Sequence, residues 1–322
     1  ISNVDGDSWE QYMGANASLV SKDNVYGIAV YQSYRNRNPY DVDGDGFSEI
    51  GKLNMNTFGL RAYYRPTQFS RLNVEYHTTN EFRRGGNKFD LEPFETDITE
   101  QTKHVINSGG LTYDFFWKEY KHKLSFYTSA QHVDRNSCYG AQQDPNAYGK
   151  TKDLTFVGGG MYVGNFDKVL FSPATFTAGM EYQHNNMHDI MAGYNRDLKQ
   201  KVRIASAFFQ NEWKLEDFTL LAGFRLDDHN LIDNLIFSPR VNMLYKPSDA
   251  FQGRLTWSTG FRAPQAYDED LHITAVGGEG VLIHLAEGLK PEKSNSFSGS
   301  VDLSGQIGHF QTNLLIEGFY TA

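Results

Sequence analysis

The sequence predicts an all-β protein, a transmembrane antiparallel β-barrel, on three observations. First, segments of about ten residues alternate apolar and polar side chains, as barrel strands do. Second, the connections between these segments alternate short and long. Third, the mean hydropathy is −0.54, and the chain lacks the run of about 20 apolar residues that a membrane helix needs. Because half of each barrel strand faces away from lipid, a membrane protein of this class can be hydrophilic overall.

The segment 218–227 shows the alternation most plainly. Apolar residues recur at every second position, with Leu221 the one exception: Phe218, Leu220, Ala222, Phe224 and Leu226. Successive side chains of a strand point to opposite faces, so the pattern gives one apolar wall and one polar wall. We expect the apolar wall to face lipid, where a Lys or Arg at mid-depth costs roughly 2–4 kcal/mol. The opposite wall is expected to be polar and largely uncharged.

About fourteen strands are expected along the chain. Their approximate centres are Ala17, Val30, Leu60, Val74, Leu111, Phe126, Val157, Ala178, Phe208, Ala222, Asn242, Leu255, Gly299 and Leu314. Short turns, mostly with Gly, Pro, Asn or Asp, are expected at 21–24, 66–69, 118–121, 164–167, 215–217, 247–250 and 304–307. Long connections are expected at 37–50, 83–103, 134–151, 185–201, 228–237 and 262–294. In bacterial barrels the short turns face the periplasm and the long loops face outside.

The composition narrows the function classes. The 322 residues carry a formal net charge of −9, which argues against nucleic acid as a partner. Aromatic residues make up 14% of the chain, as expected for girdles at the two boundaries between water and lipid. Cys138 is the only cysteine, so an internal disulfide is excluded, and it falls in a predicted loop. A soluble β-rich binding protein is the alternative for this composition.

We expect residues 1–322 to form a single domain, the central portion of a larger barrel. The chain begins with a polar and acidic segment rather than a signal peptide, and it ends inside a strand pattern at 318–322. No segment of the sequence is suited to fill a wide lumen.

Two elements in the last third resemble those of TonB-dependent outer-membrane receptors. Residues 258–264 read Ser-Thr-Gly-Phe-Arg-Ala-Pro, and residues 288–294 read Gly-Leu-Lys-Pro-Glu-Lys-Ser. The family carries a similar Phe-Arg-Ala-Pro at a strand end and Asn-Pro-Asn-Leu-Lys-Pro-Glu-Lys-Ser at the start of the next strand. The matching residues are Phe261, Arg262, Ala263, Pro264, Leu289, Lys290, Pro291 and Glu292. Here Ala-Glu-Gly at 286–288 replaces Asn-Pro-Asn; residues 237–240 and 245–247 also resemble late strands of the family.

The resemblance implies a barrel of about 22 strands around an N-terminal plug that contacts TonB. It places the protein in the bacterial outer membrane, surrounded by lipid, and implies active import of a scarce metal chelate captured by the outer loops. A surface lipoprotein is a conceivable further partner. Neither the plug nor the TonB contact can be assigned to a residue of this chain.

An acidic loop is the sharpest local motif. Asp41, Asp43 and Asp45 alternate, Gly46 occupies the sixth position of the motif, and Glu49 follows. This spacing matches the start of a calcium-binding loop, whose oxygen ligands suit a hard cation. The twelfth position is Lys52 rather than the closing acid, so further ligands would come from the next loop. Those candidates are Asp90, Glu92 and Glu95. The alternative is a solvated acidic turn.

The same loop resembles one in the cobalamin transporters of the family. The matching positions are Asp43, Asp45, Gly46 and Phe47. In that branch calcium orders the loops for cobalamin capture, so cobalamin is the first ligand expected and calcium the expected ion.

Other candidate ligand-binding residues lie in the predicted loops. His272 and His284 fall where haem receptors of the family carry an axial histidine. Tyr139, Tyr194, Arg196 and Tyr267 offer broad contact area and hydrogen bonds to a bulky polar ligand. Histidines and methionines at 184–191 could bind a soft metal, although ordinary loop residues are the preferred interpretation.

The sequence contains none of the common catalytic motifs, so an enzyme is not expected. The resemblance favours TonB-dependent import of cobalamin, with haem or a ferric siderophore as alternatives within the family. A passive porin is the rival from a different class, and opposed rows of charge on its inner wall would distinguish it.

Overall fold

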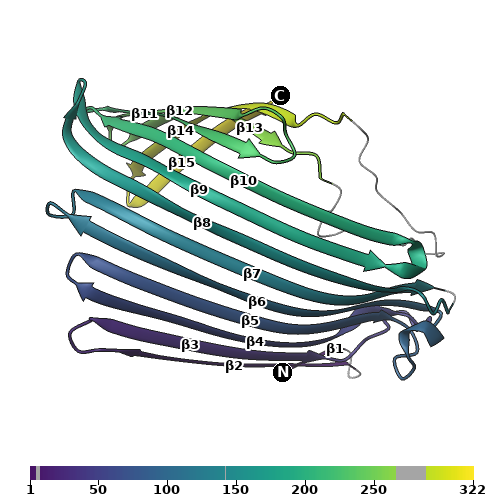
Figure 1. The fold of residues 1–322 in the computed structure, drawn as a ribbon. Helices are drawn as coiled ribbons and strands as arrows, with labels where there is room; N and C mark the ends of the chain where they lie inside the picture. Colours follow the sequence, from purple (N-terminus) through teal and green to yellow (C-terminus); the bar gives the residue numbers. More distant parts are fainter. Residues whose placement is uncertain (5–7, 142, 266–287) are drawn as a thin grey trace.

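The computed structural model describes residues 1–4, 8–141, 143–265 and 288–322. They form one antiparallel sheet of 15 strands, each paired with its neighbours in sequence (Figure 1). The strands are β1 (Ser2–Val4), β2 (Ser8–Val20), β3 (Tyr26–Arg37), β4 (Ser48–Thr67), β5 (Ser70–Gly86), β6 (Ile98–Trp117), β7 (His122–Ala141), β8 (Tyr148–Val169), β9 (Ser172–Met191), β10 (Arg196–Lys214), β11 (Phe218–His229), β12 (Ile236–Ser248), β13 (Phe251–Arg262), β14 (Glu292–Ile307) and β15 (Phe310–Thr321). Two short 3-10 helices, η1 (Pro93–Glu95) and η2 (Ala192–Tyr194), lie in the longer connections.

The fourteen expected strand centres all lie in strands β2 to β15, so the alternation located every long strand. Two of the expected short turns are wrong. β8 continues through 164–167 to Val169, and β14 continues through 304–307 to Ile307. The chain reverses instead at Leu170 and Gly308, whose φ angles are 63° and 62°. Asn165 and Gly305 resemble turn residues, but cross-strand pairing overrides that preference.

The long connections are shorter than expected because the strands run into them. The expected loop 134–151 shrinks to the six residues between β7 and β8, and the expected loop 185–201 shrinks to the four between β9 and β10. Cys138 therefore lies on β7, fully buried, rather than in a loop. Polar side chains occupy both faces at these strand ends, so the alternation of apolar and polar residues does not mark where the strands stop.

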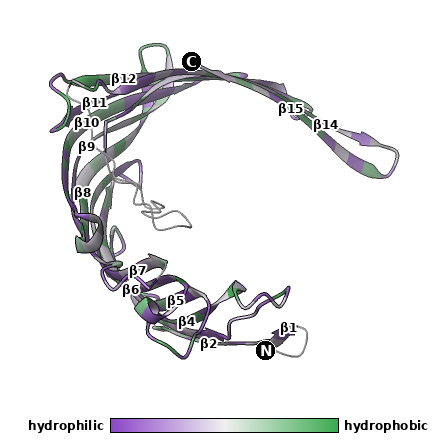
Figure 2. Cartoon of the chain, turned by 90° about the vertical axis from the view of Figure 1, so that its right-hand side faces the viewer, coloured by the Kyte–Doolittle hydropathy of each residue, from purple (hydrophilic) through white to green (hydrophobic). Residues whose placement is uncertain are grey.

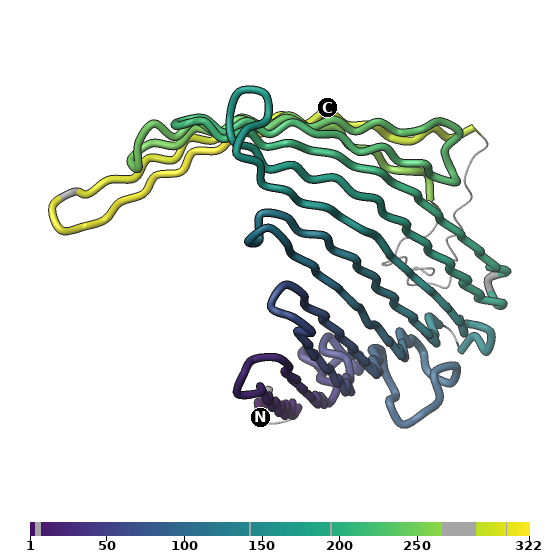
Figure 3. The backbone as a smooth tube through the Cα atoms, turned by 60° about the vertical axis from the view of Figure 1, so that its left-hand side comes forward, coloured from purple at the N-terminus to yellow at the C-terminus, as the bar shows by residue number. Residues whose placement is uncertain are grey.

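The sheet follows an open arc (Figure 2), and the first and last hairpins lie at its opposite edges (Figure 3). Within the described residues β15 pairs only with β14, and β1 pairs only with β2. Short turns and longer loops collect at opposite ends of the long strands, so the sheet has a turn end and a loop end (Figure 1). Among the described residues, no helix has the length and apolar character to cross a membrane.

One face of the sheet, the apolar face, exposes large apolar side chains. Examples are Phe126 (51% exposed), Met180 (72%) and Leu255 (63%). The expected sets in the last third share this face, because Leu255 lies opposite Gly299, Trp257 opposite Phe297, and Val301 opposite Ile316. A wall of this kind is stable against lipid and unstable in water.

The opposite face, the polar face, is rich in charge, so the expectation of a largely uncharged inner wall is wrong. Facing residues on adjacent strands form one lateral row across β5 to β9: Glu81, His104, Arg135, Thr151 and Asp189. Opposite charges along this face pair with one another, as between Arg35 and Glu10 at 2.7 Å. Pairing lowers the electrostatic repulsion among the many charges on this face. Positive and negative groups are therefore interspersed and do not form separate rows.

Aromatic rings gather on the apolar face at the turn end. His122 stacks between Trp117 and Tyr162, with ring centroids 5.3 and 6.0 Å away, and its Nδ1 lies 2.7 Å from the Tyr162 hydroxyl. Phe218 and Tyr245 form a second pair at 4.7 Å. These rings lie where an aromatic girdle is expected, at the turn end of the apolar face.

Candidate functional site

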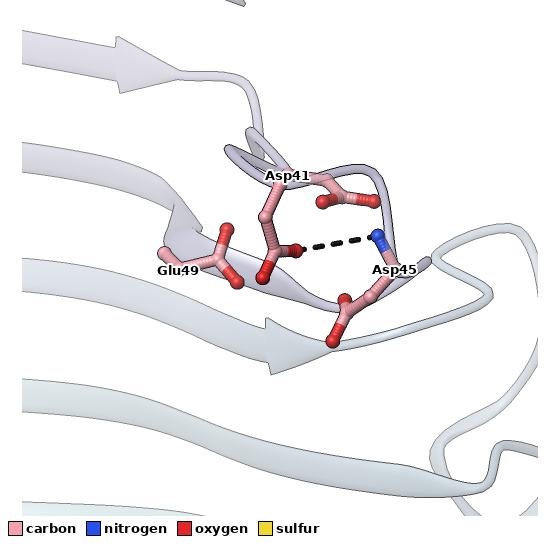
Figure 4. A group of neighbouring side chains, drawn as sticks. Asp41, Asp45 and Glu49 are labelled. Atoms are coloured by element: carbon pink, nitrogen blue, oxygen red, sulfur yellow. Dashed lines mark hydrogen bonds between the residues drawn. The ribbon is translucent and has the colours of Figure 1, made fainter.

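The acidic motif forms a compact cluster in the loop between β3 and β4. One carboxylate oxygen from each of Asp41, Asp43, Asp45 and Glu49 lies within 4.8 Å of the other three. Three of the four residues are exposed, and Figure 4 shows the carboxylates of Asp41, Asp45 and Glu49 turned toward the interior of the loop. Among the described residues no Lys, Arg or His comes within 4.0 Å of them, so the cluster has uncompensated negative charge.

Backbone N–H groups hold these carboxylates in place. Asp41 accepts from Gly44 and Gly46, each at 2.7 Å, and Glu49 accepts from Val42 at 2.6 Å. Gly44 and Gly46 have φ angles of 77° and 92°, a region that costs a side-chain-bearing residue energy. A bridge between Tyr40 and Ile50 closes the base of the loop. The chain itself therefore gathers four negative groups around one point.

The neighbouring loop does not contribute to this cluster. Asp90, Glu92 and Glu95 lie outside the 4.8 Å group, and Lys52 at the twelfth position lies on β4. If a cation is bound, its protein ligands are those of the loop itself, and water would complete the six to eight oxygens that calcium takes.

The loop 87–97 is braced by its own contacts. Arg84, 7% exposed, donates to the Leu91 carbonyl at 2.8 Å and lies 5.6 Å from the centre of the Phe89 ring. Asp97 accepts from Lys88 at 3.0 Å and from Asn87 at 2.7 Å. The Lys88 ammonium, and then the Asn87 amide, hold the pKa of Asp97 below its ordinary value.

A group of side chains around a single carboxylate is buried at the loop end of β7 to β10, and we call it the Asp189 cluster. Asp189 accepts from Arg196 Nε and from the Thr151 hydroxyl, both at 2.5 Å, and Arg135 Nη2 lies 3.6 Å away. The side chains of Asp189 and Arg196 are only 3% and 4% exposed. The structure thus places Arg196 in a buried ion pair that joins β9 to the start of β10.

Two of the remaining expected ligand residues, Tyr139 and Tyr194, lie at this end. Tyr139 is half-buried on β7, where its N–H donates to the Ala147 carbonyl at 3.1 Å. Tyr194 ends η2. Tyr267, His272 and His284 lie outside the described residues.

The strand geometry separates the residues of the possible soft-metal site at 184–191. His184 lies opposite Phe156 on the apolar face, whereas Met187 lies opposite Asp153 on the polar face. Met187 and Met191 are buried, and His188 lies 2.8 Å from Asp197. Period-two alternation therefore directs the two histidines and the two methionines to opposite faces, which favours the interpretation as ordinary residues.

The two family-like elements meet across one strand pair. Phe261 and Arg262 end β13 opposite Lys293 and Glu292 at the start of β14, and Arg262 Nη2 lies 3.4 Å from Glu292. Ala263 is 7% exposed and Pro264 follows it, whereas Leu289 to Pro291 lead into β14. The matching residues therefore close the strand pair that flanks the longest connection.

Sequence reasoning missed a polar network in the middle of the wall. Residues Tyr127, Gly159, Glu181, Ser206 and Asp227 follow one another across β7 to β11. Because Gly159 has no side chain, the Tyr127 ring crosses it and its hydroxyl donates to Glu181 at 2.7 Å. Arg225 pairs with Glu181 at 2.9 Å and with Asp227 at 2.7 Å. The alternation put Arg225 and Asp227 on the polar face, but only the register shows that Glu181 and Tyr127 meet them.

The comparisons with known proteins agree with this architecture. A family model described as TonB dependent receptor-like, beta-barrel, matches residues 11–321. This chain belongs to the TonB-dependent receptor β-barrel family. A search of curated proteins finds no match to the chain.

Solved structures of TonB-dependent receptors have the same fold at low sequence identity. The siderophore receptor PirA of Acinetobacter baumannii matches with a TM-score of 0.71 and 16% identity, over 97% of this chain and 57% of that one. PirA of Pseudomonas aeruginosa gives 0.70 and 16%, over 93% and 50%. FpvA of P. aeruginosa, solved with ferric pyoverdine, gives 0.70 and 10%, over 98% and 47%. The chain thus spans about half the length of these receptors.

Proposed function

We propose that this chain forms part of the barrel wall of an outer-membrane transporter that imports a ferric siderophore at the expense of TonB-coupled energy. The family match over residues 11–321 carries the proposal. The names of the structural neighbours support a siderophore as the class of ligand, since PirA, PfeA and FpvA are all described as receptors or complexes of that kind. TonB would act through a plug domain that these residues do not supply.

The polar face supports import over passive diffusion. Its charges are joined in short-range pairs, such as Arg225 with Glu181, instead of facing each other as separate positive and negative rows. A wall of paired charges offers hydrogen bonds to a plug or a passing chelate without a strong field across the lumen.

Transport by the full-length protein tests this function. Cells that depend on it should accumulate iron-55 from a ferric siderophore, tested with ferric enterobactin and ferric pyoverdine, and deletion of tonB should abolish accumulation. Uptake of small uncharged solutes should not change. Equal solute flux with and without TonB would instead identify a passive pore.

We propose further that the acidic loop binds calcium. The supporting observations are four carboxylates within 4.8 Å of one another, no compensating cation among the described residues, and backbone contacts that hold the loop closed. Calorimetric titration of the full-length protein with calcium should show one site that magnesium fills poorly, because magnesium demands near-ideal octahedral geometry.

Cobalamin is the second candidate ligand, and the acidic loop is the observation that favours it. Binding of cyanocobalamin to the purified full-length protein should be measured with calcium and then with a chelator. Tight binding that is lost on chelation would favour cobalamin over a siderophore. If neither ligand binds, haem should be tested next, through His272 and His284.

A further inference from the structure

Basic side chains gather at the loop end of β8 to β10, on the same side of the sheet as the apolar face, and we call this group the basic patch. The register brings the cations together, because Lys152 lies opposite His188, which in turn lies opposite Lys199. All members of the patch are exposed. They are Lys150 and Lys152 on β8, and Lys199, Lys201 and Arg203 on β10.

Acidic groups compensate only part of this charge. Asp197 lies 2.8 Å from His188 and 3.8 Å from Lys199. Asp134 faces Lys152 across the pair of β7 and β8. Among the described residues no carboxylate comes within 4.0 Å of the four cations other than Lys199. The patch is therefore positive, in a chain whose formal net charge is −9.

Toward the turn end, the same face of these strands becomes apolar at once. On β8 the next outward side chains after Lys152 are Leu154 and Phe156, which are 42% and 37% exposed. On β10 the next outward residues after Arg203 are Ala205 and Ala207. Because charge is costly against lipid, such a change marks the boundary between the hydrocarbon layer and the polar layer above it.

The distance from the turn end agrees with this boundary. Trp213, whose ring stacks on Phe171 at 5.8 Å, lies on the same face of β10 as the patch. Arg203 precedes it by ten residues, which is about 33 Å of strand at about 3.3 Å per residue. At a tilt of about 40° the rise is about 25 Å, the height of the apolar band of an outer-membrane barrel. The basic patch therefore begins where that band ends, on the side of the longer loops.

We propose that the basic patch binds the phosphates of lipopolysaccharide, the phosphorylated glycolipid of the outer leaflet. The inference rests on the outer-membrane placement that belongs to the proposed function. Charge complementarity supports it, because the lipid anchor of this glycolipid bears two phosphates on a disaccharide with acyl chains below. Cations above and apolar side chains below match that order. β8 and β10 lie about 10 Å apart across β9, so cations of both strands can reach one disaccharide.

Three glutamine substitutions test the patch. The variant Lys152→Gln, Lys201→Gln, Arg203→Gln removes three exposed cations and keeps side-chain length close to the original. The matched control is Lys22→Gln, Lys118→Gln, Lys168→Gln, which removes three exposed cations at the turn end. Both variants should fold, which the shift between heated and unheated forms on gel electrophoresis checks.

Native mass spectrometry of the full-length protein in detergent measures binding of lipid A, the two-phosphate anchor, and of lipid A without its phosphates. A chelator is present throughout, so divalent cations neither bridge the phosphates nor occupy the acidic loop. The unaltered protein and the control variant should bind the phosphorylated form at least about tenfold more tightly, and added salt should weaken this preference. The patch variant should bind the two forms equally.

Equal binding of the two forms by the unaltered protein would overturn the proposal, as would a phosphate preference that survives in the patch variant. Phosphatidylglycerol that binds as tightly as lipid A would overturn the glycolipid as the occupant. The measurement does not use the transported ligand, so failure of this inference and failure of siderophore import are separate results.

Discussion

The acidic loop and the Asp189 cluster, both at the loop end, show two ways in which a protein holds negative charge. In the acidic loop, four carboxylates share a small, mostly exposed space, and only backbone N–H groups face them. In the Asp189 cluster, a single carboxylate is buried beneath Arg196, Arg135 and Thr151. Among the described residues the first cluster has no cationic side chain against it, whereas the second is paired with two arginines. The difference teaches that carboxylate number alone does not identify an ion site; the compensating charge decides it.

Removing the carboxylate from the Asp189 cluster should have the largest effect. Asp189→Ala leaves the buried guanidinium of Arg196 without its partner, and breaking one side of a buried pair costs roughly 3–5 kcal/mol. We expect the urea midpoint of the full-length protein in detergent to fall accordingly. The matched control is Asp167→Ala, which breaks the exposed pair with Lys121 and should cost about 0–1 kcal/mol. Equal midpoint shifts for the two variants would show that the Asp189 cluster does not brace the wall.

Removing carboxylates from the acidic loop should change the response to calcium instead of breaking an ion pair. The double variant Asp41→Asn, Asp45→Asn removes two like charges, so we expect it to lose the thermal stabilisation that calcium gives the unaltered protein. In chelator we expect only a small change in stability, because like-charge repulsion falls while one of the two backbone hydrogen bonds to position 41 is lost: Gly44 and Gly46 donate to different oxygens of Asp41, and an amide keeps one. Asp90→Asn is the control and should keep the full response to calcium. A calcium response that survives in the double variant would remove the acidic loop as the site.

Calcium should also affect the acidic loop and leave the Asp189 cluster unchanged within one molecule. Hydrogen exchange followed by mass spectrometry should show slower exchange over residues 40–50 when calcium is added, with no change over 186–198. The reason is that binding orders only the segment it contacts, whereas the Asp189 cluster is already compensated. Slower exchange in both segments would indicate that the two clusters are coupled.

The smallest expected effect concerns Asp97. This carboxylate is exposed and pairs with one cation, Lys88, so its charge is better compensated than in the acidic loop and less well than in the Asp189 cluster. Because Lys88 and Asn87 lower its pKa from the ordinary 3.8, the ionised form stabilises the loop 87–97. That contribution is present above pH 3.8 and is lost as the pH falls through the lower, folded-state pKa. Amide exchange in 87–97, corrected for the intrinsic rate, should accelerate slightly below pH 3.8. Asp97→Asn should remove this dependence; if the variant keeps it, another group is responsible.

Much of the fold could be predicted from the alternation of side chains. Leu255, Val301 and Ile316 sit on the face that the pattern gave them, because a two-residue period leaves only two choices. The acidic loop could also be predicted, since its ligands are local in sequence and its glycines fix the turn. The strand ends could not, because apolar alternation fades where both faces meet water.

Contacts that depend on the register between paired strands could not be predicted from a single sequence. Arg196 was expected to meet ligand in a loop, yet its side chain pairs with Asp189 across a turn that is shorter than the pattern suggested. Tyr127 reaches Glu181 only because Gly159 stands between them, and the two partners are 54 residues apart. The expectation of a largely uncharged inner wall was wrong for the same reason. Each strand taken alone shows a few isolated charges, and their pairing emerges only across the sheet.

The length of the central strands has one more consequence. β4, β6, β7 and β9 each have 20 residues, or about 66 Å of strand at about 3.3 Å per residue. At a tilt of about 40° they rise about 50 Å, roughly twice the apolar band of about 25 Å. In the outer membrane proposed for this chain, the loop ends of these strands, with the Asp189 cluster, would therefore extend beyond the apolar band as an ordered wall. In the proposed transporter, a chelate would meet a wall that is already ordered, so capture would lose less conformational entropy than it would on loops that must first fold around the ligand.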